Sequence, residues 1–312
     1  MTETIRAGRR QIEISHPDKA MFPRAGLSKL DLARHYERVA PAMVPLVRDH
    51  PVAMHSFPEG VDGPGFFAKD VPRHFPDWIQ RVTVPKRGGS LTHVLANDAA
   101  TLVYLANQNC VTPHIWTSRA DRPREPDRIV FDLDPPGTRF ADVRAAARTL
   151  GDILRDLGLQ PFAMTTGSRG LHVVVPIRRG RDYEEVHAFA RTVSGALADR
   201  DPRRLTTEVR KAKRNERIFI DVGRNAYAQH AVAPYAVRPR PTAPVATPLH
   251  WEELGDRKLR PDRWTIKTIG DRLDADDDPW RRFRGNARAL PRPERLPRRR
   301  RGPGPDQGRR PT

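Results

Sequence analysis

Two aspartates close the apolar segment RIVFDLD, where Asp132 and Asp134 stand one residue apart just before two prolines. Alternate residues of a strand share one face, so both carboxylates point the same way. A third, Asp221, has the same setting in RIFIDVG. Carboxylates that share a face repel one another unless a cation neutralises them, and oxygen ligands suit Mg²⁺ or Mn²⁺. The three aspartates predict a site for divalent ions, whereas the first pair alone could simply cap a turn.

A glycine-flanked turn leads to a histidine in the segment TTGSRGLHV. Gly167 and Gly170 enclose Ser168 and Arg169, so backbone amides, a hydroxyl and a guanidinium can face an anion. His172 follows and points away from the apolar face of its strand. Asp132 and Asp134 point away from the apolar face of their own strand in the same way. A tight hairpin turn explains the glycines equally well, but it does not explain the histidine.

Basic residues stand before and after the Asp221 strand. They are Lys211, Lys213, Arg214 and Arg217 in EVRKAKRNER, and Arg238 and Arg240 in VAPYAVRPRP. A solvated basic face is the usual meaning of such runs. Beside a metal site, the same residues can neutralise a triphosphate.

The elements that carry these residues alternate between strand and helix. Hydrophobic alternation with period two predicts strands at 128–134, 161–166, 171–177 and 217–223. Apolar residues at helical spacing predict helices over 141–159 and 183–199. This order indicates an α/β fold in which the strands bring the three aspartates and His172 onto one face of a mixed sheet.

The composition indicates a polyanionic partner. The 312 residues include 56 basic and 38 acidic side chains, a formal net charge of +18, which favours nucleic acid or an anionic membrane surface. No apolar stretch approaches the roughly 20 residues that cross a bilayer, and the N-terminus has no signal-peptide core. The single cysteine, Cys110, excludes an intramolecular disulfide and a cysteine-rich zinc site. We therefore expect a cytoplasmic, nucleoid-associated protein with no membrane contact.

Residues 281–312 differ from the rest of the chain. They contain twelve arginines against Glu294 and Asp306, are rich in proline and glycine, and have few apolar residues. Such a segment cannot bury enough surface to offset its ordering entropy. We expect a folded domain over 1–280 and a disordered basic tail over 281–312. The tail either holds nucleic acid loosely through phosphates or is solvated without a partner.

Seven segments together carry a family resemblance, in the order ISHPDKAMFPRAGLSK, DGPGFFAKDVPRH, LANDAATLVYLANQNC, IVFDLDPPG, GSRGLHVVVPI, RIFIDVGRNAYAQHAVAPYAVRPRPTAPVATPL and WEEL. The chain resembles the polymerase domain of bacterial ATP-dependent DNA ligase D, a branch of the archaeo-eukaryotic primase superfamily. The resemblance implies a primase-polymerase fold of class α/β. It has a mixed, antiparallel-rich central sheet flanked by helices and a smaller N-terminal lobe.

The resemblance also implies roles for the residues that match. Asp132, Asp134 and Asp221 match the catalytic carboxylates that hold two Mn²⁺ or Mg²⁺ ions. The residues that match nucleotide contacts are His55, His114, Ser168, His172, Arg214, Arg224 and Arg238. The residues that match DNA contacts are Phe66 and Phe67, for template bases, and Lys19 and Lys29, for a 5′-phosphate. The alternatives are core residues for the phenylalanines, plain surface residues for the lysines, and a structural stack on Trp116 for His114.

The implied function is template-dependent addition of NTPs or dNTPs to 3′ ends at short gaps or double-strand breaks, in non-homologous end joining or excision-type repair. The implied partners are DNA ends with a 5′-phosphate, nucleoside triphosphates, Ku and a separate ATP-dependent ligase, because no ligase or nuclease segment accompanies the polymerase-like body. We expect a monomer. His55 and Ser56 stand where relatives often carry lysine and arginine, and a neutral histidine would bind phosphate less firmly.

Two other classes of function remain as alternatives. One is a different two-metal or aspartyl-phosphate enzyme, although the latter needs a hydroxyl residue where this chain has Pro136. The other is a non-catalytic nucleic-acid-binding module, which would be expected to have lost at least one of the three aspartates.

Overall fold

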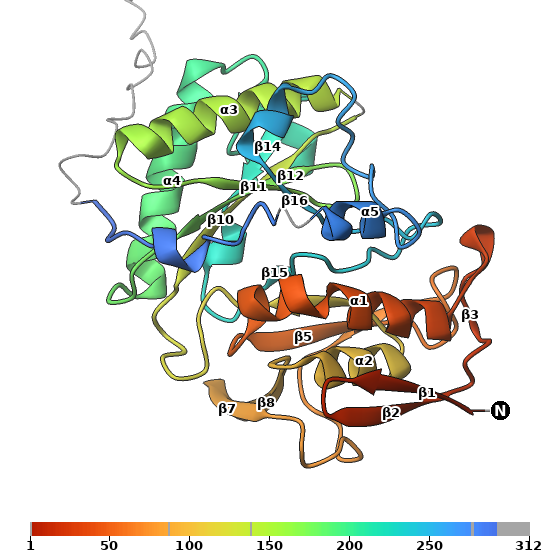
Figure 1. Cartoon of the computed structure of the whole chain (residues 1–312). Coiled ribbons are helices and arrows are strands. Elements are labelled where there is room, and N and C mark those ends of the chain that lie inside the picture. The colour runs from red at the N-terminus through yellow and green to blue at the C-terminus, as the bar shows by residue number, and fades with distance from the viewer. Residues whose placement is uncertain (1, 87, 138, 276–277, 292–312) are drawn as a thin grey trace, which may run out of the picture.

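Two sheets form the frame of the molecule, one in each lobe (Figure 1). The computed structural model describes residues 2–86, 88–137, 139–275 and 278–291. The sheet of the N-terminal lobe has the strand order β15-β9-β5-β8-β7, with β6 paired to β5. Its strands are β5 (Pro51–Ser56), β6 (Phe66–Ala68), β7 (Arg81–Lys86), β8 (Gly89–Leu95), β9 (Cys110–Ile115) and β15 (Ala231–Val232).

The sheet of the C-terminal lobe has the order β13-β14-β10-β12-β11-β16. Its strands are β10 (Arg128–Asp134), β11 (Phe162–Thr165), β12 (Leu171–Pro176), β13 (Leu205–Thr206), β14 (Ile218–Asp221) and β16 (Pro248–Leu249). Every neighbouring pair is antiparallel except β13 and β14. Two small hairpins complete the strands, β1 (Thr2–Ala7) with β2 (Arg10–Ser15) and β3 (Ala20–Phe22) with β4 (Leu27–Ser28).

Helices pack on each sheet. They are α1 (Lys29–Val47), α2 (Ala99–Asn107), α3 (Phe140–Asp156), α4 (Tyr183–Arg200) and α5 (Ile269–Asp274). Figure 1 shows α3 and α4 over the C-terminal sheet, and α1 and α2 in the N-terminal lobe. Reciprocal capping boxes fix the first turns of α1 and α4, since Ser28 pairs with Asp31 and Asp182 pairs with Glu185. The predicted α/β class, the antiparallel-rich sheet and the flanking helices are confirmed.

The strand and helix predictions for the C-terminal lobe are confirmed within a few residues at each boundary. Hydrophobic alternation along β10 buries Ile129, Phe131 and Leu133 at 0% exposure, and the face that carries Asp132 and Asp134 remains partly accessible. The topology places β10 between β14 and β12. Consequently the strand that carries Asp132 and Asp134 has neighbouring strands on both sides.

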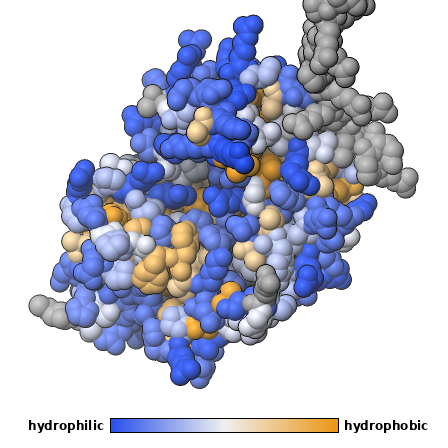
Figure 2. Space-filling model, turned by 180° about the vertical axis from the view of Figure 1, so that it is seen from behind, coloured by the Kyte–Doolittle hydropathy of each residue, from blue (hydrophilic) through white to orange (hydrophobic). Residues whose placement is uncertain are grey.

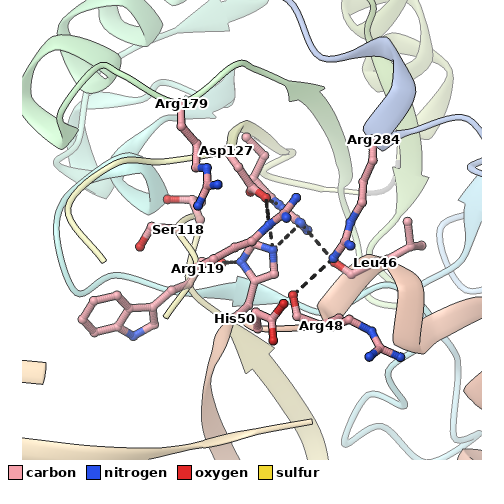
Figure 3. Close-up of polar contacts among 12 residues, drawn as sticks. Leu46, Arg48, His50, Ser118, Arg119, Asp127, Arg179 and Arg284 are labelled. Carbon is pink, nitrogen blue, oxygen red and sulfur yellow. Dashed lines mark hydrogen bonds and ion pairs between the residues drawn. The ribbon is translucent and has the colours of Figure 1, made fainter. Parts of the chain in front are cut away.

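Buried ionic contacts join the two lobes at the start of β10 (Figure 3). Asp127 Oδ1 accepts a hydrogen bond from Arg128 Nε at 3.0 Å, and its Oδ2 accepts one from Arg119 Nε at 2.7 Å. The Arg128 guanidinium also donates to the carbonyl oxygen of Leu46, near the end of α1, and to His50 Nε2. The cluster therefore ties α1 and the strand that follows it to the C-terminal sheet.

The segment after residue 280 differs from the expectation. Phe283 is 2% exposed and stacks on Trp280 at 4.9 Å, and the Arg178 amide donates to the Arg288 carbonyl oxygen at 2.8 Å. Residues 281–291, for which the composition predicts a disordered tail, thus pack on the domain, because Phe283 supplies an aromatic ring that stacks on Trp280. Residues 292–312 lie outside the described residues.

The surface is mostly hydrophilic on the face seen in Figure 2, with separate apolar patches rather than a continuous band. Among the described residues, the large hydrophobic side chains that are exposed are Phe66, Phe67 and Val209. None of the described helices combines the length and the apolar composition that crossing a bilayer requires.

Candidate active site

Three polar residues of the predicted site stand side by side on neighbouring strands. In the antiparallel registers, Asp132 of β10 is directly opposite His172 of β12 and directly opposite Asp221 of β14. Directly opposed residues put their side chains on the same sheet face, about 5 Å apart at Cβ. The convergence expected from strand periodicity is therefore present, with Asp134 one pleat further along the same strand.

The two carboxylates of β10 differ electrostatically. Burial opposes the ionisation of Asp132, but His172, whose Nε2 lies 3.5 Å from Asp132 Oδ2, together with Arg224 and Arg238 outweighs it and lowers the pKa of Asp132. Burial and the neighbouring Asp132 raise the pKa of Asp134. The protein's own cations thus do not fully compensate the negative charge at this end of the strand. A bound divalent cation would neutralise the remaining charge.

The donor set fits a hard divalent cation, because three carboxylates, Asp132, Asp134 and Asp221, share this face with His172. Within the described residues, no three acidic, histidine or cysteine side chains already meet around one point. Asp221 Oδ1 accepts a hydrogen bond from the Gly223 amide at 2.7 Å, and Asp134 faces Arg169 and Arg214 at 3.5 and 3.7 Å. Ion binding would therefore require Asp134 and Asp221 to exchange these contacts for contacts with the cation.

The turn between β11 and β12 is both a tight turn and a wall of the site. Thr166 closes it, since its hydroxyl donates to the Gly170 carbonyl oxygen at 3.0 Å and accepts from the Gly170 amide at 3.2 Å. Gly167 has φ +63°, and a Cβ there would lie 2.8 Å from Cγ of Arg238. A Cβ at Gly170 would clash with the Leu133 carbonyl oxygen. Both glycines are needed for this close approach, which supports the tight turn, and anion binding by the segment stays a prediction.

A hollow opens beside Asp132 and Asp134 and gathers most of the predicted nucleotide-binding residues. Of the predicted residues, those that line it are His114, Asp132, Asp134, Ser168, His172, Arg224 and Arg238. The hollow is also lined by Arg169 and Arg240, which the sequence indicates as anion-binding residues, and by His230. Arg240 donates to Ser168 Oγ at 2.9 Å. Of these three, His230 gave no signal in the sequence, because it stands alone in an irregular segment.

Arg238 is a cation held at the inner wall of this hollow. Burial, together with the nearby Arg240 and Arg224, lowers the pKa of Arg238 to about 10, although Asp132 partly offsets the effect. The Nε atom of Arg238 is buried and has no hydrogen-bond partner within the described residues. A buried guanidinium with a free donor is suited to bind an anionic ligand.

Arg214 lies in a neighbouring hollow rather than in the one just described. Its guanidinium stacks on the Phe219 ring at 3.8 Å and donates to the carbonyl oxygens of Glu208 and Val209. It also lies 3.7 Å from Asp134 Oδ2. The residue predicted to contact the nucleotide is thus held against a predicted metal ligand.

Aromatic rings of the N-terminal sheet form a cluster that includes His114 and His230 of the hollow. His55 of β5 stacks on Phe67 of β6 at 4.2 Å, and Phe67 contacts the rings of His114 and His230, each at 5.1 Å. Phe66 and Phe67 are 53% and 46% exposed, which excludes the alternative that they are core residues. Among the described residues, the ring contacts of His114 are with His55, Phe67 and His230 and not with Trp116.

Lys19 and Lys29 meet in a separate hollow, which Ser15, His16, Asn107 and Asn109 also line. Lys29 is only 3% exposed, and its ammonium donates to Ser15 Oγ at 3.1 Å and to the Asn107 carbonyl oxygen at 3.4 Å. Burial and the neighbouring Lys19 lower the pKa of Lys29. Lys29 is therefore not a plain surface residue, and two adjacent ammonium groups favour an anion here.

Comparison with known proteins identifies the family. Residues 28–280 match the family described as the LigD primase-polymerase domain. The multifunctional non-homologous end joining DNA repair protein LigD of Mycobacterium tuberculosis is 32% identical over 93% of this chain, which covers 41% of that protein. LigD of Pseudomonas aeruginosa is 32% identical over 91% of the chain, which covers 34% of it. The chain thus spans about two fifths or less of the length of these relatives.

A solved structure matches the fold as well. The polymerase domain of Mycobacterium tuberculosis ligase D in complex with DNA aligns with a TM-score of 0.83 and 30% identity, over 88% of this chain and 99% of that domain. The chain belongs to the LigD primase-polymerase domain family.

Proposed function

We propose that this chain adds nucleotides, directed by a template, to 3′ ends at gaps or breaks in DNA, through a mechanism with two divalent cations. It belongs to a family of metal-dependent nucleotidyltransferases that act in non-homologous end joining. The observation that carries the proposal is the register that puts Asp132 between His172 and Asp221, beside a hollow lined with basic side chains.

Asp132, Asp134 and Asp221 are the residues that would hold the cations. When bound, such ions lower the pKa of an attacking hydroxyl and neutralise charge on the leaving pyrophosphate. The ion pairs of Asp134 with Arg169 and Arg214 are long, at 3.5 and 3.7 Å, so they hold the carboxylate weakly before ions and substrate arrive.

The basic wall would bind the triphosphate. Ser168 offers a hydroxyl, Arg240 already donates to that hydroxyl, and Arg238 has a free donor at its buried Nε. His172 Nδ1 is likewise buried without a partner in the described part of the chain. These groups can orient the phosphates and neutralise the charge that develops as pyrophosphate leaves.

DNA contacts would come from two other surfaces. Phe66 and Phe67 present exposed rings on which template bases can stack. Lys19 and Lys29 offer paired ammonium groups for the 5′-phosphate on the far side of a gap. We extend the proposal to end joining, with Ku as the protein that delivers DNA ends and a ligase activity that seals the product.

A primer-extension assay on gapped DNA tests this function. The substrate carries a one-nucleotide gap with a 5′-phosphate, and the reactions compare Mn²⁺ with Mg²⁺ and NTPs with dNTPs. We expect templated addition by the wild type, loss of addition in Asp221→Ala, and normal addition in Asp199→Ala, which removes an exposed acidic residue of α4. Addition by Asp221→Ala at the wild-type rate would refute the metal mechanism.

A further inference from the structure

His230 lies in the wall of the hollow, just before β15, and the mechanism above gives it no role. The strand that follows it, β15, places it beside the predicted site, because Val232 of β15 pairs with His114 of β9. The His230 ring lies 5.2 Å from the His114 ring and 5.1 Å from the Phe67 ring. Its Nδ1 is buried and has no hydrogen-bond partner among the described residues. A buried ring nitrogen without a partner is costly unless a ligand supplies one.

The imidazole of His230 is neutral at physiological pH. Burial, with Lys69 and Arg224 nearby, lowers the pKa of His230 to about 4. A neutral imidazole has one ring nitrogen that donates and one that accepts. It therefore suits an uncharged polar partner better than a phosphate, for which Arg238 and Arg240 already provide positive charge.

Two groups of side chains in the site differ in chemistry, and His230 belongs to the group of aromatic rings. Ser168, Arg238 and Arg240 form a side suited to phosphates. His114 and His230, backed by Phe67, form a side suited to the nucleoside half of a nucleotide. An enzyme that copies a template must accept all four bases, which differ in their donors and acceptors. A fixed side-chain hydrogen bond is therefore best directed at the sugar, which is common to all four.

We propose that His230 hydrogen-bonds a sugar hydroxyl of the incoming nucleotide and so determines how strongly the enzyme prefers a ribonucleotide to its deoxy analogues. A hydroxyl both donates and accepts, so it can pair with Nδ1 of His230 in either tautomer. The inference rests on the proposed function, since it requires a nucleoside triphosphate in this hollow.

The test uses single-nucleotide addition to gapped DNA with ATP, 2′-deoxy-ATP and 3′-deoxy-ATP, and measures kcat and KM for each. His230→Phe keeps an aromatic ring and removes both nitrogens, whereas His230→Asn keeps a donor and an acceptor near the Nδ1 position. We expect His230→Phe to lower the kcat/KM of ATP about three- to tenfold more than that of at least one deoxy analogue, which is the range of one neutral hydrogen bond. His230→Asn should retain most of the wild-type preference.

A matched control is His74→Phe, which changes an exposed histidine that contacts Gln108 and does not line the hollow. This variant should leave the relative kcat/KM values of ATP, 2′-deoxy-ATP and 3′-deoxy-ATP unchanged. Equal losses on all three nucleotides in His230→Phe would overturn the inference and assign His230 a packing role, and so would unchanged kinetics. Failure of the wild type to extend any primer would instead refute the proposed function, so the two failures are distinguishable.

Discussion

Charged side chains stand at both ends of β10, but the two ends differ in how those charges are paired. At the start of the strand, the Asp127 carboxylate is 7% exposed and receives hydrogen bonds at 2.7 and 3.0 Å from Arg119 and Arg128 (Figure 3). At its end, the Asp134 carboxylate is 35% exposed and its arginine partners lie 3.5 and 3.7 Å away. The first cluster is satisfied within the protein, and the second is open to a ligand.

The pKa directions agree with this difference. Burial opposes ionisation of Asp127, yet Arg128, His50 and Arg119 outweigh it and lower its pKa well below the usual range. At the other end, burial and Asp132 raise the pKa of Asp134. We infer that a buried charge with complete partners serves stability, and that a like-charge cluster with incomplete partners marks a binding site.

The largest expected effect on stability concerns Asp127 at the start of β10, where the charges are paired within the protein. Asp127→Asn leaves the buried Arg128 and the partly buried Arg119 without their counter-charge. We expect a loss of about 3–5 kcal/mol in unfolding free energy, measured by urea denaturation. The matched control is Asp121→Asn, which breaks an exposed pair with Arg179 and should cost about 0–1 kcal/mol. Equal losses of unfolding free energy in Asp127→Asn and Asp121→Asn would contradict the distinction between buried and exposed ion pairs.

The same variant has a defined pH dependence. Because the pKa of Asp127 is depressed in the folded state, its stabilisation is complete above the unfolded value of about 4 and is lost as pH falls through the folded value. The difference in melting temperature between wild type and Asp127→Asn should therefore be constant above pH 5 and should narrow below pH 4. A difference that narrows between pH 8 and 6 would point to His50 instead.

The hollow that Lys19 and Lys29 line extends the comparison to a positively charged site. Lys29 is buried beside Lys19, and its ammonium donates to Ser15 and Asn107 rather than to a carboxylate. Its positive charge is therefore incompletely paired, as the negative charge of Asp134 is at the end of β10. Lys19→Ala with Lys29→Met should weaken binding to gapped DNA that bears a 5′-phosphate by about 1.5–3 kcal/mol before screening. Binding to the unphosphorylated DNA should hardly change.

Fluorescence anisotropy on both DNAs measures this effect, with Lys258→Ala as a control for the loss of an exposed lysine elsewhere. Equal losses on the two DNAs would mean that Lys19 and Lys29 supply general basicity only.

The smallest expected effect concerns residues 292–312, which carry eight arginines against Glu294 and Asp306. Deleting them, and keeping the packed residues 281–291, should leave turnover at saturating DNA unchanged. DNA affinity should fall, and the slope of log affinity against log salt should flatten by roughly 0.9 for each phosphate that the protein no longer neutralises. An unchanged salt slope would indicate that this segment does not bind DNA.

Local patterns in the sequence predicted one part of the molecule well. Hydrophobic alternation identified β10, β12 and β14, and it placed Asp132, His172 and Asp221 on faces that the sheet then brought together. These predictions succeeded because side-chain direction along a strand follows from its period of two.

Contacts between distant segments could not be predicted in the same way. Arg128 meets His50, 78 residues away. His230 meets Phe67 because β15 pairs with β9, β9 with β5, and β5 with β6. Neither contact has a local periodic signal. The arginines around Phe283 also mask its packing on Trp280, so the composition predicts an end of the folded domain that lies before Phe283.

The most direct test of the central claim is a titration of the protein with Mn²⁺ alone, measured by isothermal calorimetry. We expect wild type and Asp127→Asn, studied below the melting temperature of the variant, to bind Mn²⁺, and Asp132→Asn and Asp134→Asn not to bind it. Asp134→Asn should also keep or gain thermal stability, because it removes a carboxylate whose pKa is raised by burial and by Asp132. Equal Mn²⁺ binding by Asp132→Asn and wild type would contradict the assignment of this end of β10 as the metal site.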